Sequence, residues 1–143
     1  MPTRIIRDVI ERQPILTATG DISVREATRR MVSAHVGSIM ITEGDRIAGI
    51  FTERDALVRV LAKAVDPETT RVDAVMTPNP QTVEADVPLG HALHLMYEGG
   101  FRHVPVVEDG RPIGMVSARD ALGPELAAFE DELQQRVTIA ERL

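Results

Sequence analysis

The hydrophobic pattern of the chain changes its period in the same order twice. In residues 24–32 and 89–96, apolar residues recur every three to four positions, which predicts two amphipathic helices with one buried face each. Each of these segments is followed by two apolar runs of strand length, separated by acidic residues and glycine. A short extended stretch precedes each helix, and a second helix follows each strand pair. The pattern therefore predicts two units with the order β-α-β-β-α.

Capping and turn residues set the boundaries of these elements. Ser23 and Glu26 are the two ends of a capping-box sequence, and Pro88 stands where a first-turn proline is expected. The second helix of each unit is expected to begin at Thr52 or at Ser117. The expected strands are 15–17, 38–42 and 46–51 in the first unit, and 81–83, 103–107 and 112–116 in the second.

The two units are copies of one sequence. When the chain is shifted by 65 residues, positions 8–57 align with 73–122 without a gap, and twelve residues coincide. Average residue usage gives roughly three coincidences by chance. The identical pairs include Asp8/Asp73, Gly49/Gly114 and Asp55/Asp120. A unit of this size is too small to bury a core alone, so we expect the copies to pack on each other around a pseudo-two-fold axis.

The expected fold is therefore α/β (α+β), with two pseudo-symmetric β-α-β-β-α repeats packed through their sheets. Repeat one covers residues 4–65 and repeat two covers 72–123, with a linker at 66–71. Residues 124–143 follow as an amphipathic helix, because apolar residues recur at three- and four-residue steps from Leu126 to Ala140. Two interpretations of this helix stay open: it folds back over its own domain, or it forms a surface for a partner such as a second copy.

The densest matches between the copies lie at the end of the last strand of each repeat. Both segments, 49–55 and 114–120, contain a glycine, two apolar residues, a hydroxyl, two further residues and an aspartate. The glycine allows another group to approach the backbone, and the hydroxyl lies at a helix N-terminus that favours an anion. The aspartate is able to accept two hydrogen bonds from a ribose diol. The same hydroxyl and aspartate also form an ordinary helix cap, and the spacing alone favours the cap.

The repeat, the hairpins and both heptapeptides resemble a tandem pair of cystathionine-β-synthase (CBS) domains, the Bateman module. Residues 73–78 are similar to the segment that opens such a domain, and residues 101–107 to the segment that leads into its second strand. The resemblance covers about residues 4–123. It implies a regulatory ligand that contains adenosine, most commonly AMP, ADP or ATP, and in some members S-adenosylmethionine or a dinucleotide such as NAD(H). It implies no required cofactor.

The resemblance also implies where such a ligand is held, in clefts between the copies. By position, Asp55 and Asp120 are implied at the ribose hydroxyls, and Thr52 and Ser117 at ribose or phosphate. The other implied contacts are Thr17, Thr82 and Val83 on the adenine side, Ile39, Ile50, Val104 and Met115 around the base, and Arg54, Arg102, His103 and Arg119 near phosphate. For Arg54 and Arg119, surface ion pairs of little energy are an equal alternative. Copy one has Gly37 and Ser38 where copy two has Arg102 and His103, so a charged tail is better served in copy two. Copy one also departs from the pattern at 10–13 and at Met40, which bears on the occupancy of its site.

Composition and charge narrow the classes of function. The chain has 143 residues, no cysteine and a net charge of -6, which excludes disulfides and thiolate zinc sites and disfavours nucleic-acid binding. It has four aromatic residues, too few for a platform that stacks single strands. There is no Walker-type phosphate loop, no apolar run of membrane-spanning length and no signal peptide, so we expect a cytoplasmic protein that does not bind membranes. His91 and His94 stand three apart on a helix without an evident third metal ligand.

Three functions compete at this point. The first is a stand-alone regulatory module, not an enzyme, that binds an adenosine ligand between its repeats and signals to an unknown client protein by a change of conformation. The second is a structural dimerisation module that has no ligand, in which the two aspartates are caps. The third, a small enzyme acting on a nucleotide, has little support because no general base is identifiable near Thr52 or Ser117. In the first and second cases we expect a homodimer.

Overall fold

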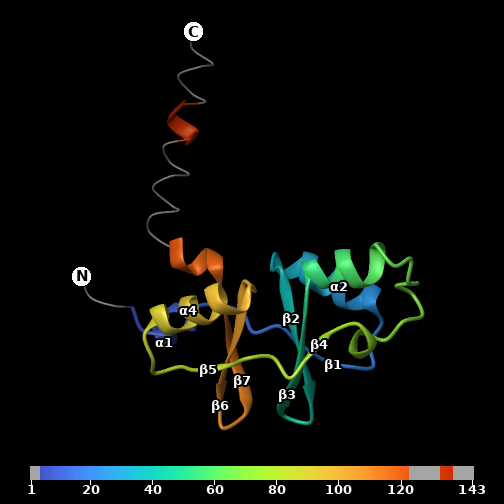
Figure 1. The fold of residues 1–143 in the computed structure, drawn as a ribbon, viewed down its shortest axis with the longest axis horizontal. Helices are drawn as coiled ribbons and strands as arrows, with labels where there is room; N and C mark the ends of the chain where they lie inside the picture. Colours follow the sequence, from blue (N-terminus) through green and yellow to red (C-terminus); the bar gives the residue numbers. More distant parts are fainter. Residues whose placement is uncertain (1–3, 123–132, 137–143) are drawn as a thin grey trace.

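The computed structural model describes residues 4–122 and 133–136, in which two halves lie side by side (Figure 1). The first half contains a four-stranded sheet in the order β1-β2-β3-β4, and the second a three-stranded sheet in the order β5-β6-β7. The two hairpins meet near their turns, where the Ile47 N–H donates to the Gly110 carbonyl and Arg111 pairs with Asp45. The mixed α/β architecture with two similar sheets agrees with the expected fold.

The strands pair in the same way in both sheets. In the first sheet, β1 (Thr17–Thr19) is parallel to β2 (Ser38–Glu43), which is antiparallel to β3 (Arg46–Thr52), and β3 is antiparallel to β4 (Thr77–Pro78). In the second, β5 (Val83–Glu84) is parallel to β6 (His103–Glu108), which is antiparallel to β7 (Arg111–Ser117). Each hairpin has one register shift, after Ile41 in the first and after Val106 in the second, so even this irregularity is repeated.

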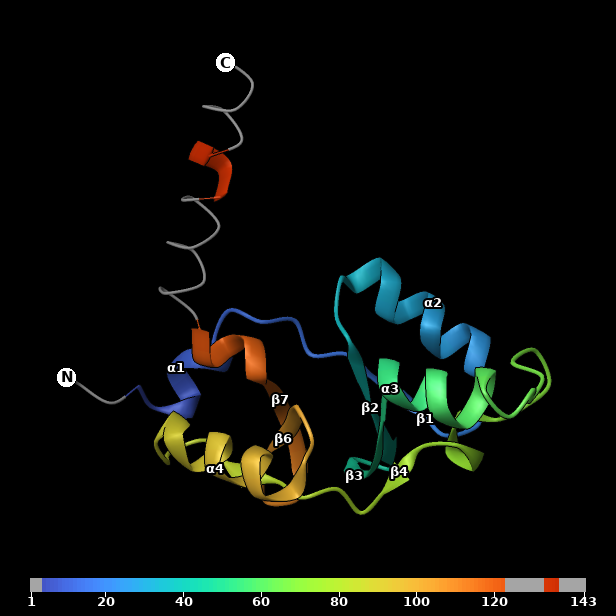
Figure 2. The same ribbon diagram turned by 45° about the horizontal axis from the view of Figure 1, so that its top comes forward.

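The helices flank the sheets in equivalent places (Figure 2). The long helices are α2 (Val24–Ala34) and α4 (Leu89–Gly99). The short ones are α1 (Ile6–Ile10), α3 (Glu53–Asp55) with the π-helical η1 (Ala56–Leu61), and the 3₁₀ turns η2 (Val72–Ala74) and η3 (Ala118–Leu122). Of the C-terminal helix expected over 124–143, residues 133–136 are helical, and the rest lies outside the described residues.

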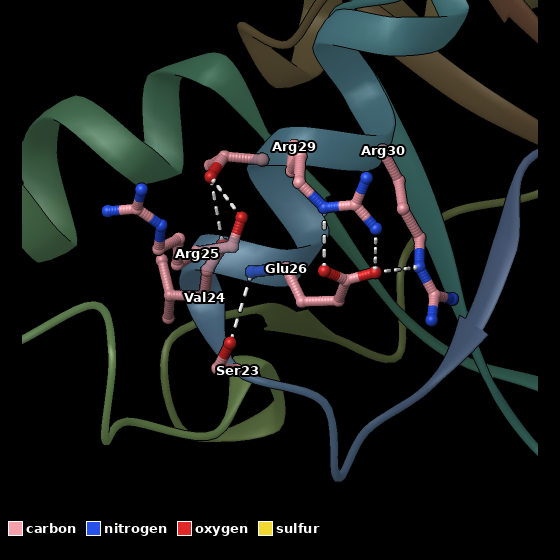
Figure 3. Close-up of polar contacts among 7 residues, drawn as sticks. Ser23, Val24, Arg25, Glu26, Arg29 and Arg30 are labelled. Carbon is pink, nitrogen blue, oxygen red and sulfur yellow. Dashed lines mark hydrogen bonds and ion pairs between the residues drawn. The ribbon is translucent and has the colours of Figure 1, made fainter.

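The start of α2 follows its capping residue, with one difference from the expectation. The Ser23 hydroxyl accepts the Glu26 N–H at 3.0 Å, as a cap should. The Glu26 carboxylate accepts from Arg29 and Arg30 one turn later instead of forming the reciprocal half of the capping box (Figure 3). These hydrogen bonds, first the one from Arg29, lower the pKa of Glu26 to about 2. In α4, Pro88 is the residue before the helix and not a member of its first turn.

Each repeat receives part of its core from the segment that precedes the other repeat. Ile6 and Ile10 of α1 are buried with Val83, Val104 and Val116 in the core of the second half. In Figure 1, α1 accordingly lies beside α4. Val72 and Val75 are buried in the core of the first half, and β4 extends the first sheet. The two segments before the repeats, residues 4–14 and 72–80, are called the leading segments below.

The leading segments correspond at a shift of 66 residues, not 65. Ile6 donates its N–H to the Val87 carbonyl at 3.0 Å, and Val72 donates to the Ile22 carbonyl at 2.8 Å. These donors are 66 residues apart, whereas the acceptors are 65 apart. The gapless alignment is therefore wrong before the first strand, and Asp8 and Asp73 are not equivalent. Pro14 and Pro80 coincide at the shift of 66, which places one extra residue of copy one after its proline.

The conserved spacing of the two heptapeptide glycines has a packing reason. A Cβ built on Gly114 would lie 2.8 Å from the Cβ of Ile10, and one built on Gly49 would collide with the sulfur of Met76. Ile10 and Met76 are equivalent at the shift of 66. The close approach expected at these glycines is thus made by the leading segments, which cross the last strand of the other repeat.

Candidate functional site

A cleft of about 740 Å³ lies between the repeats. Repeat one lines it with the end of the first leading segment, the last turn of α2 and the start of β2. Repeat two lines it with the start of β6, the end of β7 and the start of η3. Its volume falls within the range of small-molecule sites, roughly 300–1,000 Å³. The cleft therefore has the size and the two-repeat composition of a ligand site.

Asp120 lines this cleft, and its two carboxylate oxygens have different partners. Oδ2 accepts the Ser117 N–H at 2.7 Å and the Ser117 hydroxyl at 3.3 Å, which caps η3. Oδ1 accepts the side-chain amide of Gln13 at 2.9 Å. The side chain of Asp120 is partly buried. One oxygen is thus used by the cap, while the other is held by a side chain of the leading segment.

Asp55, its counterpart in repeat one, is closed in. Oδ2 accepts the Thr52 N–H at 3.0 Å and the Thr52 hydroxyl at 3.2 Å. Oδ1 faces the Thr77 hydroxyl at 3.4 Å and the Nε of Arg59 at 3.5 Å. Only 8% of Asp55 is exposed, and neither it nor Thr52 lines the cleft of about 740 Å³.

The charged groups of the cleft come mainly from repeat two. Arg102, His103 and Arg119 line it on that side, and Glu53 lines it on the side of repeat one. Burial lowers the pKa of His103, and the carboxylates of Glu53 and Asp120 partly oppose this change. The cleft therefore presents two guanidinium groups and a titratable imidazole close to the Asp120 carboxylate.

The structure brings six of the fifteen implied site residues to this cleft: Arg102, His103, Met115, Ser117, Arg119 and Asp120. Thr52 and Asp55 lie together at the closed cap of repeat one. Arg54 points across to repeat two, where it donates to the Gly100 carbonyl at 3.5 Å. Thr17 lies on β1, Ile50 is buried on β3, and Thr82 precedes β5; none of the three lines the cleft.

Three of the residues implied around the base lie in the cores instead. Ile39 and Val104 are fully buried, each in its own repeat, and Val83 is buried on β5. The physical reason is the alternation of side chains along a strand. On β2, Ile39 faces the core, so its neighbours Ser38 and Met40 line the cleft. Met40, not Ile39, is the apolar neighbour that β2 offers to a ligand.

Several cleft residues were not expected from the sequence. They are Gln13, Pro14 and Leu16 from the segment that joins α1 to β1, Met31, Val32 and His35 near the end of α2, and Met40 and Glu53. Strict alternation along β2 would have identified Met40. His35 adopts a left-handed backbone, with φ of 57°, that ends α2 and places it at the cleft. The local sequence does not identify Gln13 as a cleft residue, because its contact with Asp120 joins residues that are 107 positions apart.

The remaining candidate groups carry less chemistry. His94 pairs with Glu98 at 2.9 Å on the exposed side of α4, and His91 is exposed. Within residues 4–122 and 133–136, no three acidic, histidine or cysteine side chains are grouped to hold a metal. No helix in the described part of the chain is long and apolar enough to cross a membrane. A second cavity of about 560 Å³ lies by the first hairpin and is lined by Asp21, Glu43 and Asp73 together with Arg71.

Comparison with known proteins places the fold and the cleft in context. A CBS domain-containing protein of Arabidopsis thaliana, CBSCBSPB5, is 36% identical over 126 residues, which is 87% of this chain and 23% of the relative. The chain spans only 15% to 23% of the length of the first curated relatives that it matches.

Two solved structures are similar over nearly their whole length. A CBS domain protein of Pyrobaculum aerophilum complexed with AMP has a TM-score of 0.76 and 25% identity, covering 87% of this chain and 99% of that one. The CBS domain pair of protein MJ0100, in complex with 5′-methylthioadenosine and S-adenosyl-L-methionine, has a TM-score of 0.76 and 26% identity, covering 90% and 99%. The family model described as CBS domain matches residues 6–62 and 72–123, which are the two repeats. The chain therefore belongs to the CBS domain family and contains two CBS domains in tandem.

Proposed function

We propose that this protein is a regulatory module that binds an adenosine-containing ligand in the cleft between its repeats. The observation that carries the proposal is the set of hydrogen bonds that the two carboxylate oxygens of Asp120 accept. Its Oδ2 completes the cap of η3, while its Oδ1 lies at a cleft of about 740 Å³ and is bound there by one neutral amide. A ribose hydroxyl is able to replace that amide as donor without disturbing the cap.

The rest of the cleft matches the other parts of a nucleotide. Arg102 and Arg119 supply positive charge for a phosphate near the ribose position, and the His103 imidazole adds a hydrogen-bonding group beside them. Met40, Met115 and Leu16 supply apolar surface for a base. The two similar CBS structures that contain AMP or S-adenosyl-L-methionine support the same class of ligand.

Regulation follows if the ligand changes the relation of the two repeats. The cleft has walls from both, so a ligand that fits one arrangement better than another shifts the protein toward it. The Gln13 contact provides a physical link, because Gln13 belongs to the chain that crosses from the core of repeat two to β1. In this proposal a client protein reads the shift, and no chemical reaction takes place.

The exposed apolar side chains favour self-association as a second element of the proposal. Val32 and Tyr97 are 74% and 89% exposed at equivalent positions of α2 and α4, and Leu57 and Leu61 are 60% and 72% exposed on η1. Large exposed apolar side chains on the helices of both repeats favour an interface with another chain. We propose a homodimer through this helical face. Sedimentation or light scattering tests it, since a single chain of 15.7 kDa would contradict a dimer.

Thermal unfolding with AMP, ADP, ATP, S-adenosylmethionine and NADH tests the ligand. A ligand at about 100 times its Kd stabilises the folded state by about 2.7 kcal/mol, which raises Tm by several degrees. The Asp120→Asn variant is the control and is expected to lose the shift while it stays folded. If no compound shifts Tm at millimolar concentration, the ligand-binding proposal is wrong. The structural dimerisation module is then the remaining function.

A further inference from the structure

We infer that each chain binds one adenosine ligand, in the Asp120 cleft, and that the equivalent carboxylate of repeat one is closed to ligands. This inference rests on the proposed function and refines its stoichiometry. It starts from a property that the two repeats share. In both, Oδ2 of the aspartate accepts the N–H and hydroxyl of the residue three before it. Oδ2 therefore has the same partners in both repeats, and the difference between the two carboxylates lies at Oδ1.

At Asp55, Oδ1 is held by two groups from different elements. Arg59 lies one turn later on η1 and approaches Oδ1 with its Nε at 3.5 Å. Its Nη1 also donates to the Met76 carbonyl at 2.8 Å, so the guanidinium is anchored at both ends. The Thr77 hydroxyl approaches Oδ1 at 3.4 Å from β4, which is itself paired with β3. A ribose would have to break the ion pair with Arg59 and the hydrogen bond from Thr77 at a side chain that is 8% exposed.

At Asp120, Oδ1 is held by Gln13 at 2.9 Å. Gln13 is a neutral, flexible side chain on an irregular segment, and it lines the cleft together with Asp120. A single hydrogen bond from a neutral amide is replaceable at little net cost when another donor takes its place at the same oxygen. A ribose hydroxyl arriving in the cleft is such a donor.

The sequence explains why repeat two lacks the contacts that Arg59 and Thr77 make with Asp55. At the shift of 65, Arg59 corresponds to Pro124, which has no side-chain donor. At the shift of 66 that applies to the leading segments, Thr77 corresponds to Glu11, which has no hydroxyl group. The aligned sequence of copy two therefore lacks both the guanidinium and the hydroxyl that close Asp55. This difference between the repeats is one of residue type and does not depend on side-chain conformation.

Isothermal titration of the full chain with AMP, and separately with S-adenosylmethionine, measures the stoichiometry directly. We expect one ligand per chain. The matched variants are Asp55→Asn and Asp120→Asn, which remove the same charge from equivalent caps. Asp120→Asn is expected to weaken binding at least tenfold, while Asp55→Asn changes the affinity by less than twofold. Circular dichroism and Tm establish that both variants are folded.

Methionine methyl signals in NMR give an independent readout that needs no variant. Met40 and Met115 line the Asp120 cleft, whereas Met76 lies against Gly49 beside the closed cap. We expect AMP to shift the signals of Met40 and Met115 and to leave that of Met76 in place. Two ligands per chain, or a dominant shift at Met76, would overturn the single-site inference and leave the proposed function standing. No binding of any adenosine compound would overturn both.

Discussion

In repeat one and repeat two, the starts of α3 and η3 have a hydroxyl residue and an aspartate at equivalent positions, and the two aspartates have different surroundings. In repeat one, Thr52 and Asp55 form a complete capping box that Arg59 and Thr77 seal from outside. In repeat two, Ser117 and Asp120 keep the cap but stand at the wall of a cleft. The difference teaches that the cap of this motif needs only one of the two carboxylate oxygens. A carboxylate has two oxygens, and the neighbours of the second one decide its use.

The largest effect is expected from the side chains that each repeat lends to the other. Ile6 is fully buried in the core of repeat two, so Ile6→Ala should lower the free energy of unfolding by about 2–5 kcal/mol. The matched variant Val72→Ala removes fewer buried atoms from the core of repeat one, and a smaller loss is expected. Urea unfolding measures both losses. Native-state hydrogen exchange should locate the first in β6 and β7 and the second in β2 and β3; the reverse pattern would contradict the exchanged cores.

Removing each carboxylate in turn should give different losses of stability at the closed cap of Asp55 and at the cap of Asp120, which lines the cleft. Asp55→Ala deletes the cap together with the contacts to Arg59 and Thr77, and we expect a loss of about 2 kcal/mol. Asp120→Ala deletes a cap and one contact to a neutral amide, and we expect about 1 kcal/mol. Chemical denaturation without ligand measures both. Equal losses would mean that Arg59 and Thr77 add nothing to the cap.

The Gln13 contact predicts a change in affinity rather than in stability. Gln13→Ala removes the group that occupies Oδ1 of Asp120, so AMP should bind about 2–10 times more tightly. Titration calorimetry measures the change, with Gln13→Ala in the Asp120→Asn background as the control, where no gain is expected. Weaker binding in Gln13→Ala would show instead that Gln13 contacts the bound ligand.

The smallest effect concerns pH. Burial lowers the pKa of His103 below its usual value of about 6.5, so the unfolded chain takes up the proton first as pH falls. The resulting stability is fully present above the unfolded pKa and declines as pH falls below it. His103→Asn should therefore lose less Tm between pH 7.5 and pH 5.5 than the wild-type chain. His91→Asn, on the exposed side of α4, is the control and should follow the wild type.

Much of this architecture follows from the periodicity and the internal repeat. The long helices, the hairpins and the hydroxyl-aspartate caps are local features, and each lies within a residue or two of its predicted place. The site is harder to predict, because it depends on contacts between distant segments. Asp120 and Ser117 are marked by their motif, whereas Gln13 reaches the cleft only because α1 is docked on the far repeat.

Two differences between prediction and structure have identifiable causes. The CBS resemblance implies Ile39, Val104 and Val83 at the ligand by position, whereas strand alternation directs their side chains into the cores. The short segments α1, η2 and β4 are not predicted because two to five residues carry no periodic signal. One consequence was the gapless alignment, in which a single extra residue after Pro14 concealed the true counterpart of each leading segment.

The exchanged leading segments also set the order in which the chain is able to fold during synthesis. Ile6 and Ile10 leave the ribosome about a hundred residues before their partners Val104 and Val116. Contacts of such sequence separation slow folding and leave apolar surface exposed meanwhile. The core of repeat one needs Val72 and Val75 and is therefore complete first. In a nascent chain of this protein, Ile6 and Ile10 therefore stay without their core partners until β7 has emerged.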